Sequence, residues 1–250
     1  MNIEGSLTFK TGGDGTKHYE LKAEQIIVTG ELLIGDETTP YPDKATITLF
    51  GTPNQDSFVY SNNVMAGNKI LFVGGKFIAH GKDNLNGGAT HVKLLEKAVK
   101  GSKTIWVPTG MSWGFNDRVV IAPNGFKYHL PEYKTILAYD PTTGFVRLNS
   151  ALEDDHFGAA DVESYTEGGA TYTYDLRGEV GHLTRNVVIQ GNEAEGWGGQ
   201  IVVADFTDQN EKVSAGYIQL KNVEIKRMSQ KDSNRAAIRF EKSGTSDNPP

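Results

Sequence analysis

Short runs of branched apolar residues, each ended by a glycine, recur along most of this chain. Examples are IIVTGELLIG at residues 26–35, ATITLFG at 45–51 and KILFVGGKFIAHG at 69–81. β-Branched residues suit a pleated, half-buried surface, and glycine marks the turn between strands. The strand pairs recur roughly every 20 to 24 residues, which predicts the coils of a solenoid. Each coil buries its inward side chains only against its neighbours, so several coils must stack.

The middle of the chain breaks this pattern in two ways. The segment THVKLLEKAVK, residues 90–100, has apolar residues at nearly helical spacing, which predicts a short helix or a helical turn. Four strands then follow with turn residues between them, at 103–108, 117–123, 133–139 and 144–150. These strands lie close together in the sequence and predict a compact antiparallel or mixed patch.

The strand pattern resumes in the last third of the chain. Residues 153–175 are acidic and loop-like apart from one TYTYD strand, which predicts a long excursion across the surface. From RGEVGHLTRNVVIQG, residues 177–191, further coils are predicted at 199–205, 216–228 and 235–241. We therefore expect an all-β fold: a parallel β-helix, or solenoid, with an inserted antiparallel β patch and at most one short helix.

Composition excludes several classes of function. The net charge of −6 argues against nucleic-acid binding through bulk charge, and no apolar run approaches the roughly 18 residues of a membrane span. We expect neither a nucleic-acid partner nor membrane insertion by this segment. Cysteine is absent, so disulfides and thiolate metal sites are excluded. The start MNIEGSLTF lacks the layout of a secretory signal, and the ending SGTSDNPP predicts a fragment whose partners include the rest of its parent chain.

Several segments together resemble one known family. The glycine-strand series at 21–51 and 69–81, the run W-x-x-x-D-x-V-V-I-A at 113–122 and the segment ALEDDHFG at 151–158 each match one of its elements. RGEVGHLTRNVVIQG at 177–191 is the most specific match. These residues resemble the eight-glycine domain family, as in fibrocystin and in the cell-migration-inducing and transmembrane hyaluronidases.

The resemblance implies a right-handed parallel β-helix and a secreted or cell-surface parent protein. It implies an eight-glycine domain with inserted loops over residues 1–176 and continuing coils over 177–250. Hyaluronidase-like members carry a histidine-rich stretch where this chain has RAAIRFE, with Arg239 and Glu241 in place of histidines, and Gln200 replaces a further histidine. These departures favour a carbohydrate-binding or adhesion module over a hyaluronan-cleaving enzyme.

Three functions stay open at this stage. The first is an extracellular module that binds a polysaccharide or another glycan. The second is a hyaluronidase-type polysaccharide depolymerase, assisted by calcium, and the third is a structural scaffold segment of a large surface protein. For catalysis the first carboxylate pair to consider is Asp117 with Glu132, which matches a family glutamate, because glycoside hydrolysis uses two carboxyl groups. For calcium, an oxygen-binding ion, the metal candidates are Asp154, Asp155 and the adjacent His156.

Candidate ligand-binding residues combine cations, histidines and aromatic rings. Arg177 and Arg185 can each fork onto a sugar carboxylate while Glu179 orients one of them, although a structural ion-pair network explains the same alternation of charge. Asn186 is predicted to satisfy turn backbone groups. Further candidates are His80, His91 and Arg239. Rings that can stack on a sugar are Trp106, Trp113, Trp197, Tyr128 and Tyr133. The glycine-rich loop around Trp113 is compatible with exposure, whereas the family resemblance implies a structural role at this position, and both interpretations stay open. A shared site requires Arg177, Arg185, Arg239 and His80 to converge.

Overall fold

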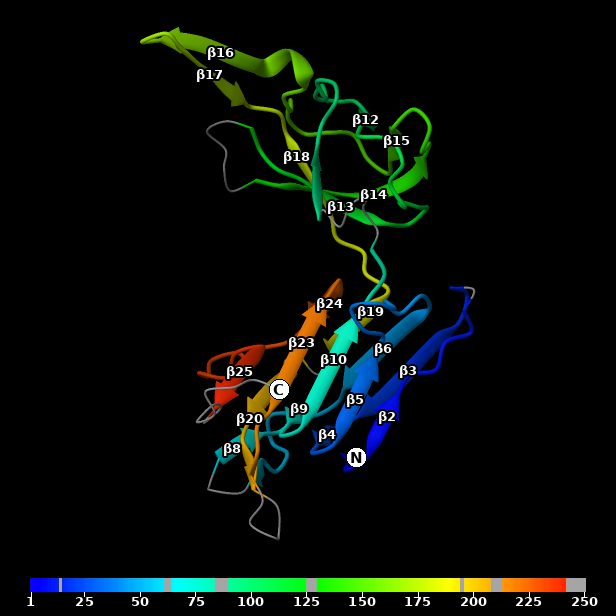
Figure 1. Cartoon of the computed structure of the whole chain (residues 1–250), viewed down its shortest axis with the longest axis vertical. Coiled ribbons are helices and arrows are strands. Elements are labelled where there is room, and N and C mark those ends of the chain that lie inside the picture. The colour runs from blue at the N-terminus through cyan, green and yellow to red at the C-terminus, as the bar shows by residue number, and fades with distance from the viewer. Residues whose placement is uncertain are drawn as a thin grey trace. The chain divides into compact units, whose positions relative to one another are not determined.

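The chain folds into two compact units that are joined twice. The structure is a computed structural model that describes residues 1–13, 15–60, 64–83, 90–124, 130–193, 196–207 and 213–241. Unit 1 comprises Met1–Lys82 with Arg185–Pro250, and unit 2 comprises Asp83–Thr184 (Figure 1). Each unit has its own hydrophobic core.

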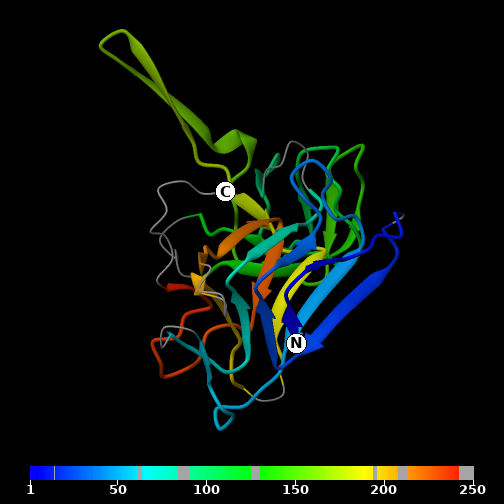
Figure 2. The same cartoon turned by 60° about the horizontal axis from the view of Figure 1, so that its bottom comes forward.

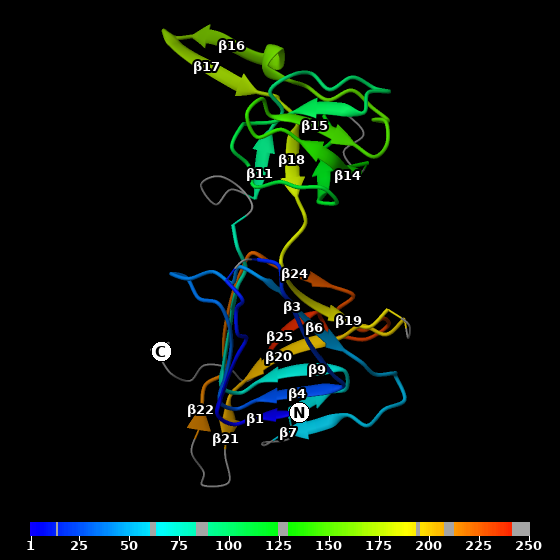
Figure 3. The same ribbon diagram turned by 90° about the vertical axis from the view of Figure 1, so that its right-hand side faces the viewer.

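Unit 1 is built on three sheets in which every strand runs parallel to its neighbour (Figure 3). The first sheet has β1 (Asn2–Ile3), β4 (Gln25–Val28), β9 (Ile70–Val73), β20 (Gln200–Ala204) and β25 (Ile238–Glu241). The second has β2 (Ser6–Thr8), β5 (Glu31–Ile34), β10 (Lys76–His80) and β23 (Tyr217–Lys221). The third has β3 (His18–Ala23), β6 (Lys44–Leu49), β19 (Val187–Gly191) and β24 (Val223–Lys226). Two small antiparallel hairpins accompany them, β7 (Phe58–Tyr60) with β8 (Val64–Gly67) and β21 (Phe206–Thr207) with β22 (Val213–Ser214).

The chain visits the three sheets in turn, so equivalent residues of successive coils lie in line. Ile26 pairs with Leu71, Leu71 with Ile201 and Ile201 with Ile238 across the first sheet. The first three of these side chains are fully buried in the core of unit 1, and Ile238 packs against that core. Unit 2 is inserted in the sequence between β10 and β19, so the third coil is completed only after residue 184.

Stacked glycines form the corner between the first and second sheets. The N–H of Glu31 donates to the Gly5 carbonyl, that of Lys76 to Gly30 and that of Tyr217 to Gly75, each at 2.8 Å. A Cβ at Gly30 would collide with the carbonyl oxygen of Gly5, and one at Gly75 with that of Gly30. The recurring glycine of the sequence pattern is therefore required by the close approach of successive coils.

Unit 2 is built on one antiparallel sheet of six strands. Their order is β11 (His91–Lys93), β18 (Glu179–His182), β13 (Arg118–Ile121), β14 (Glu132–Tyr139), β15 (Phe145–Leu148) and β12 (Thr104–Trp106). One face covers a core that includes Val119, Ile121, Ile136 and Val146. A separate hairpin pairs β16 (Val162–Glu167) with β17 (Ala170–Asp175), and the 3₁₀ helix η3 (Ala159–Asp161) leads into it.

The helix predicted at residues 90–100 is wrong. That segment begins with β11, and Val92 pairs with Val180 of β18. Leu94 and Ala98 are buried, whereas Leu95 and Val99 are exposed. The apolar spacing matched a helix, but antiparallel pairing with a strand 88 residues later in the sequence (Val92 with Val180) supplied the backbone hydrogen bonds.

The prediction of an all-β chain is confirmed, and η3 is the only helix that the described residues form. The sheets are mixed over the chain as a whole, being parallel in the three large sheets of unit 1 and antiparallel in unit 2. The excursion at 153–175 contains the expected TYTYD strand, now part of β17, together with a partner strand that the sequence did not indicate. The predicted division into an eight-glycine domain at residues 1–176 and continuing coils at 177–250 rests on the family resemblance. The two units are defined by contacts, so they do not test this division, and it stays a prediction.

Candidate functional site

The exposed face of the six-stranded sheet in unit 2 carries a row of cross-strand neighbours. His91 pairs with Gly181, Gly181 with Val120 and Val120 with Tyr133. Residues directly opposite each other in antiparallel strands share a face, so this row points away from the core. Tyr133 is 63 % exposed, and Gly181 places no side chain between His91 and Val120. We call this surface the outer face.

Most of the other charged residues of the outer face are basic. Arg118 lies on the same face of β13 as Val120, and Arg147 of β15 pairs with Ala138 of β14; both side chains are exposed. Lys93 contacts the carboxylates of Asp175 at 3.4 Å and Glu179 at 3.8 Å. The predicted ligand residues His91 and Glu179 thus lie on neighbouring strands of one sheet, with Glu179 engaged in an ion pair.

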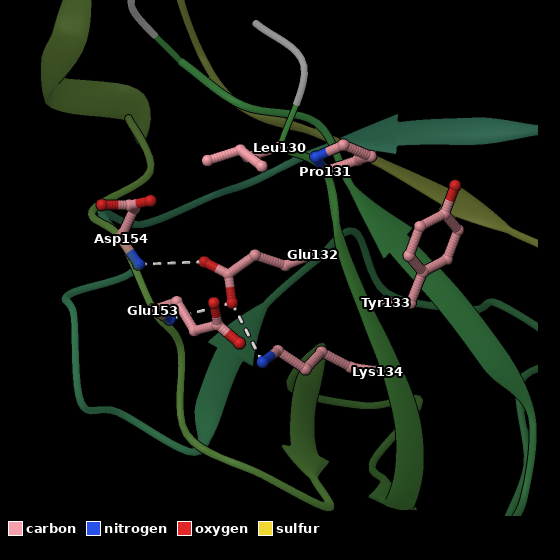
Figure 4. Close-up of a pocket in the computed structure, with 7 residues that line it drawn as sticks. All are labelled: Leu130, Pro131, Glu132, Tyr133, Lys134, Glu153 and Asp154. Atoms are coloured by element: carbon pink, nitrogen blue, oxygen red, sulfur yellow. Dashed lines mark hydrogen bonds and ion pairs between the residues drawn. The ribbon is translucent and has the colours of Figure 1, made fainter. Parts of the chain in front are cut away.

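A pocket of about 300 Å³ opens at the start of β14 (Figure 4). It is lined by Leu130, Pro131, Glu132, Tyr133, Lys134, Glu153 and Asp154. Figure 4 shows Glu132 and Lys134 pointing toward the 153–154 segment, while the Tyr133 ring lies on the other side of β14. This opposite placement follows from the alternation of side chains along a strand.

Glu132 is buried and bound on every side. Its Oε2 accepts the N–H of Glu153 at 2.9 Å and contacts Lys134 Nζ at 3.0 Å. Its Oε1 accepts the N–H of Asp154 at 3.0 Å and lies 2.9 Å from His156 Nε2. An ionised carboxylate has about four acceptor positions, so none is left for a substrate. We call Glu132, Lys134 and His156 the buried network.

The buried network keeps Glu132 ionised. Burial acts to raise the pKa of Glu132, but the hydrogen bonds from Glu153, His156, Lys134 and Asp154 outweigh it and lower the pKa to about 2. A general acid in glycoside hydrolysis needs a raised pKa instead. The catalytic role of Glu132 stays a prediction, and this environment argues against it.

Asp117, the other catalytic candidate, lies at the opposite end of the β13–β14 hairpin. Its Oδ2 accepts the N–H of Gly114 at 2.8 Å and contacts His182 Nε2 at 3.1 Å. The N–H of Ile136 donates to the Asp117 carbonyl, whereas Ile121 pairs with Glu132. The backbone positions of Asp117 and Glu132 are therefore separated by four residues of strand, or about 13 Å along the hairpin. Known glycosidase pairs lie roughly 5 to 9.5 Å apart.

Of the two interpretations left open for Trp113, the structure supports the structural one. Its side chain is 6 % exposed and stacks on His182, with ring centroids 5.5 Å apart and an interplanar angle of 25°. It also packs on Tyr139, with centroids 5.8 Å apart. Despite its glycine-rich loop, this tryptophan is part of the hydrophobic core of unit 2.

The other aromatic candidates differ in their surroundings. Trp106 packs edge-on against Phe145, with centroids 5.7 Å apart, and Trp197 donates its indole N–H to Asn68 Oδ1 at 3.1 Å. Tyr128 lies outside the described residues. Tyr133 is therefore the aromatic candidate that is both described and widely exposed.

The cations expected to share a groove are divided between the two units. Arg177 belongs to unit 2 and forks onto Asp175, with Nε–Oδ1 at 2.9 Å and Nη2–Oδ2 at 2.8 Å. Arg185, Arg239 and His80 belong to unit 1. Arg177 thus serves the base of the β16–β17 hairpin, and the four ligand assignments stay predictions.

Two of the unit 1 candidates, Arg239 and His80, are in contact with or buried within the fold of unit 1. Arg239 donates to the carbonyls of Met65 at 3.3 Å and Ala66 at 3.2 Å, and it contacts Glu241 at 3.1 Å. His80 is 1 % exposed, and neither ring nitrogen has a hydrogen-bond partner among the described residues. Arg185 is half-buried at the return into unit 1, directly before Asn186.

The calcium candidates face different partners. Asp155 accepts the N–H of Lys100 at 2.7 Å and contacts Lys97 at 3.4 Å, whereas His156 is buried against Glu132 and the Ala122 carbonyl. Asp154 contributes its backbone N–H to Glu132. Within the described ranges, no three His, Asp or Glu side chains gather in a way that could hold a metal ion. The described residues also form no helix long and apolar enough to cross a membrane.

The structural role predicted for Asn186 is confirmed. Its side-chain amide donates to the carbonyls of Tyr41 and Asp43, both at 2.6 Å, and its Oδ1 accepts the N–H of Lys82 at 2.9 Å. The side chain thereby joins the returning chain to the preceding coil, through Tyr41 and Asp43, and to the earlier part of its own coil, through Lys82. The RGEVGHLTRN element spans β18 of unit 2 and this junction in unit 1.

Comparisons with known proteins identify the family of the first part of the chain. Residues 1–93 match the family model described as the G8 domain. This segment is a G8 domain. The G8 domain covers the stacked glycines Gly5, Gly30 and Gly75 and reaches β11. The resemblance to the eight-glycine family is therefore confirmed.

The relatives extend beyond the G8 domain. Fibrocystin-L of Mus musculus is 27% identical over 231 residues, which cover 90% of this chain and 5% of that protein. Fibrocystin-L of Homo sapiens is 30% identical over 190 residues, covering 73% of this chain and 4% of the relative. A solved tailspike, gp54 of Acinetobacter baumannii bacteriophage AP22 in complex with a capsular saccharide, aligns over 91% of this chain and 30% of its own. Its TM-score of 0.30 and identity of 13% are too low to equate the two folds.

Sequence reasoning missed three groups of residues that the structure brings out. Asp43, in unit 1, accepts hydrogen bonds from Thr11, Gly12 and Lys17. The Lys134–Glu132 pair was missed although both residues lie on the same face of β14, because its burial depends on the separate segment 153–156. The tyrosines of β16 and β17 form a ladder, for which the period-two TYTY pattern was an available signal.

Proposed function

We propose that this chain is a carbohydrate-binding module of a G8-domain protein and that the outer face of unit 2 binds an acidic polysaccharide. In this proposal unit 1 is a right-handed parallel β-helix that serves as the scaffold. The parent protein is secreted or displayed at the cell surface, as the family resemblance implies. The chain spans only 4% and 5% of the two fibrocystin-L relatives, so the proposal concerns this segment and not the parent as a whole.

The observation that carries the proposal is the exposed Tyr133 ring in a row that also holds His91. A tyrosine ring offers an apolar face for a sugar and a hydroxyl for hydrogen bonding. Arg118 lies two residues from the row, opposite Thr135, and Arg147 lies on the same face farther along the sheet, opposite Ala138. A guanidinium can bind a carboxylate with two parallel hydrogen bonds. Gly181 leaves the centre of the row low, so a flat sugar ring can approach the backbone.

The depolymerase alternative has less support. Glu132 has no acceptor position left, and Asp117 is already bonded to Gly114 and His182. The third alternative, a pure scaffold, fits the dense packing of unit 1 but gives no role to an exposed row of tyrosine, histidine and arginine.

Calorimetry with hyaluronan oligosaccharides, and with neutral glucose oligosaccharides as a second probe, tests the proposal. We expect binding to the acidic probe that Tyr133→Ala weakens about fivefold, the scale of one aromatic contact. Phe115→Ala is the matched control, because Phe115 is 71 % exposed in the same unit but lies off the row. Arg118→Ala should weaken binding to the acidic probe.

Other outcomes distinguish the alternatives. Absence of affinity for every acidic and neutral polysaccharide would remove the binding function and leave the scaffold. Binding that Tyr133→Ala leaves intact would move the site elsewhere. Shortened hyaluronan chains after incubation, with or without calcium, would instead establish the depolymerase.

A further inference from the structure

The β16–β17 hairpin extends away from the rest of unit 2 as a two-stranded arm (Figure 2). The turn between its strands is Gly168–Gly169, and both residues have positive φ, 60° and 82°. Such values suit the type I′ turns that join tight hairpins. Every described side chain of the two strands is exposed. We call residues 162–175 the tyrosine arm.

One face of the tyrosine arm is a ladder of three tyrosines. Tyr165 pairs with Tyr172 across the strands, and their rings stack with centroids 5.1 Å apart. Tyr165 also stacks on Tyr174, with centroids 5.5 Å apart and an interplanar angle of 5°. The three residues are 44 %, 48 % and 50 % exposed, so about half of each remains accessible beyond these contacts.

Two carboxylates stand on the same face, one at each end of the ladder. Glu163 pairs with Tyr174, and Glu167 pairs with Ala170. Neither glutamate forms an ion pair within the part of the chain that the structure describes. The stretch from 157 to 176 contains no lysine or arginine. The two glutamates are four residues apart on one strand, which corresponds to about 13 Å.

A role in stabilising the hairpin does not by itself explain a tyrosine ladder with a glutamate at each end. An isolated two-stranded ribbon is marginally stable, and cross-strand aromatic pairs contribute to it. That role explains why the rings touch each other. Stability of the hairpin does not require a carboxylate at both ends of the ladder. It also does not require that the segment lack lysine and arginine, either of which could have neutralised these carboxylates.

We propose that the tyrosine arm binds an extended segment of a partner protein that carries two basic side chains four residues apart. In an extended strand, residues i and i+4 point to the same side and are separated by the distance between Glu163 and Glu167. Each cation meets one glutamate, and its alkyl stem and charge lie over the tyrosine rings. An acidic polysaccharide is repelled by the same carboxylates, so the arm and the outer face select ligands of opposite charge.

Three peptides and the full chain test this proposal by calorimetry at low ionic strength. The matching probe is the capped peptide Thr-Arg-Thr-Val-Thr-Arg-Thr. A second peptide places its arginines three residues apart, on opposite sides of the strand, and a third has glutamates in their place. We expect the first to bind more tightly than the second and the third not to bind.

The variants are chosen to keep the arm folded. Glu163→Gln with Glu167→Gln leaves the tyrosine ladder intact and should weaken the matching peptide about fivefold, the scale of two exposed ion pairs. Glu37→Gln with Glu96→Gln removes the same charge from exposed positions elsewhere and should change nothing. Tyr165→Ala should also weaken binding, and circular dichroism reports whether the rest of the chain stays folded.

Two results would overturn the proposal. One is equal affinity for the two arginine peptides, because the spacing would then be irrelevant. The other is binding of neutral glucose oligosaccharides that depends on Tyr165 while the peptides fail, which would make the arm a glycan platform. Both readouts are separate from the outer face, since Tyr133→Ala leaves the arm unchanged.

Discussion

Unit 1 and unit 2 differ in how they use glycine and polar residues. In unit 1 glycines lie where successive coils approach, and a Cβ at Gly30 or Gly75 would collide with backbone. In the hairpin of unit 2, Gly168 and Gly169 have open space around their Cα atoms and supply only a turn. Asn186 holds the coils of unit 1 together from a buried position, whereas Glu163 and Glu167 of unit 2 point into solvent.

The contrast follows from sheet type. Each stacked parallel strand of unit 1 pairs on one or both sides and packs inward, so substitutions there are felt by the neighbouring coils. The antiparallel sheet of unit 2 buries one face and leaves the other exposed to water. We therefore expect changes in unit 1 to alter stability and changes on the exposed surfaces of unit 2 to alter binding, with the buried network as the exception within unit 2.

Breaking the buried network should have the largest effect. Glu132→Gln removes the charge that Lys134 and His156 share, and we expect a loss of about 3 to 5 kcal/mol in the free energy of unfolding of unit 2. Hydrogen exchange should accelerate in β13, β14 and β15 and stay unchanged in β9 and β10. Glu153→Gln, at an exposed neighbour, is the control. Equal acceleration in both units would show that they unfold together.

A methyl group at a stacked glycine should destabilise unit 1, as Glu132→Gln is expected to destabilise unit 2. Gly75→Ala places a Cβ against the Gly30 carbonyl, and we expect a loss of about 3 kcal/mol, at the upper end for overpacking. Gly5→Ala is a matched control from the same corner, because nothing lies within 4 Å of its added Cβ. Urea unfolding measures both. Similar losses for the two variants would contradict the close-approach explanation.

Acid should weaken unit 2 through Glu132. The folded pKa of Glu132 is about 2, below its ordinary value of 4.5, so its stabilising effect is complete above the ordinary value and is lost as the pH falls toward 2. Between pH 5 and pH 3 we expect a loss of about 2 kcal/mol from this group. Other carboxylates titrate in the same range, so the quantity to measure is the pH slope of the wild type minus that of Glu132→Gln. Parallel slopes would show that Glu132 is not the linked group.

The sequence predicted those features that are carried by local pattern. Glycine spacing predicted the coils, because each corner repeats the same steric demand, and Asn186 was correctly taken as structural. Most of the buried network could not be foreseen. Lys134 lies on the same strand as Glu132, but the other groups around Glu132 come from residues 21, 22 and 24 positions away. The exposure of Trp113 was left open for a similar reason, because its burial depends on His182 from a distant strand.

The smallest expected effect concerns Arg177, which the sequence left open between a ligand contact and a structural ion pair. Its fork holds the pKa of Asp175 well below the usual range, chiefly through the Arg177 hydrogen bond, but the pair is exposed enough for water to screen it. Arg177→Ala should therefore leave the free energy of unfolding nearly unchanged. If the fork only supports the base of the tyrosine arm, hyaluronan affinity should stay unchanged while peptide affinity falls slightly. A large loss of hyaluronan affinity at unchanged stability would make Arg177 a ligand contact and extend the outer face to the base of the arm.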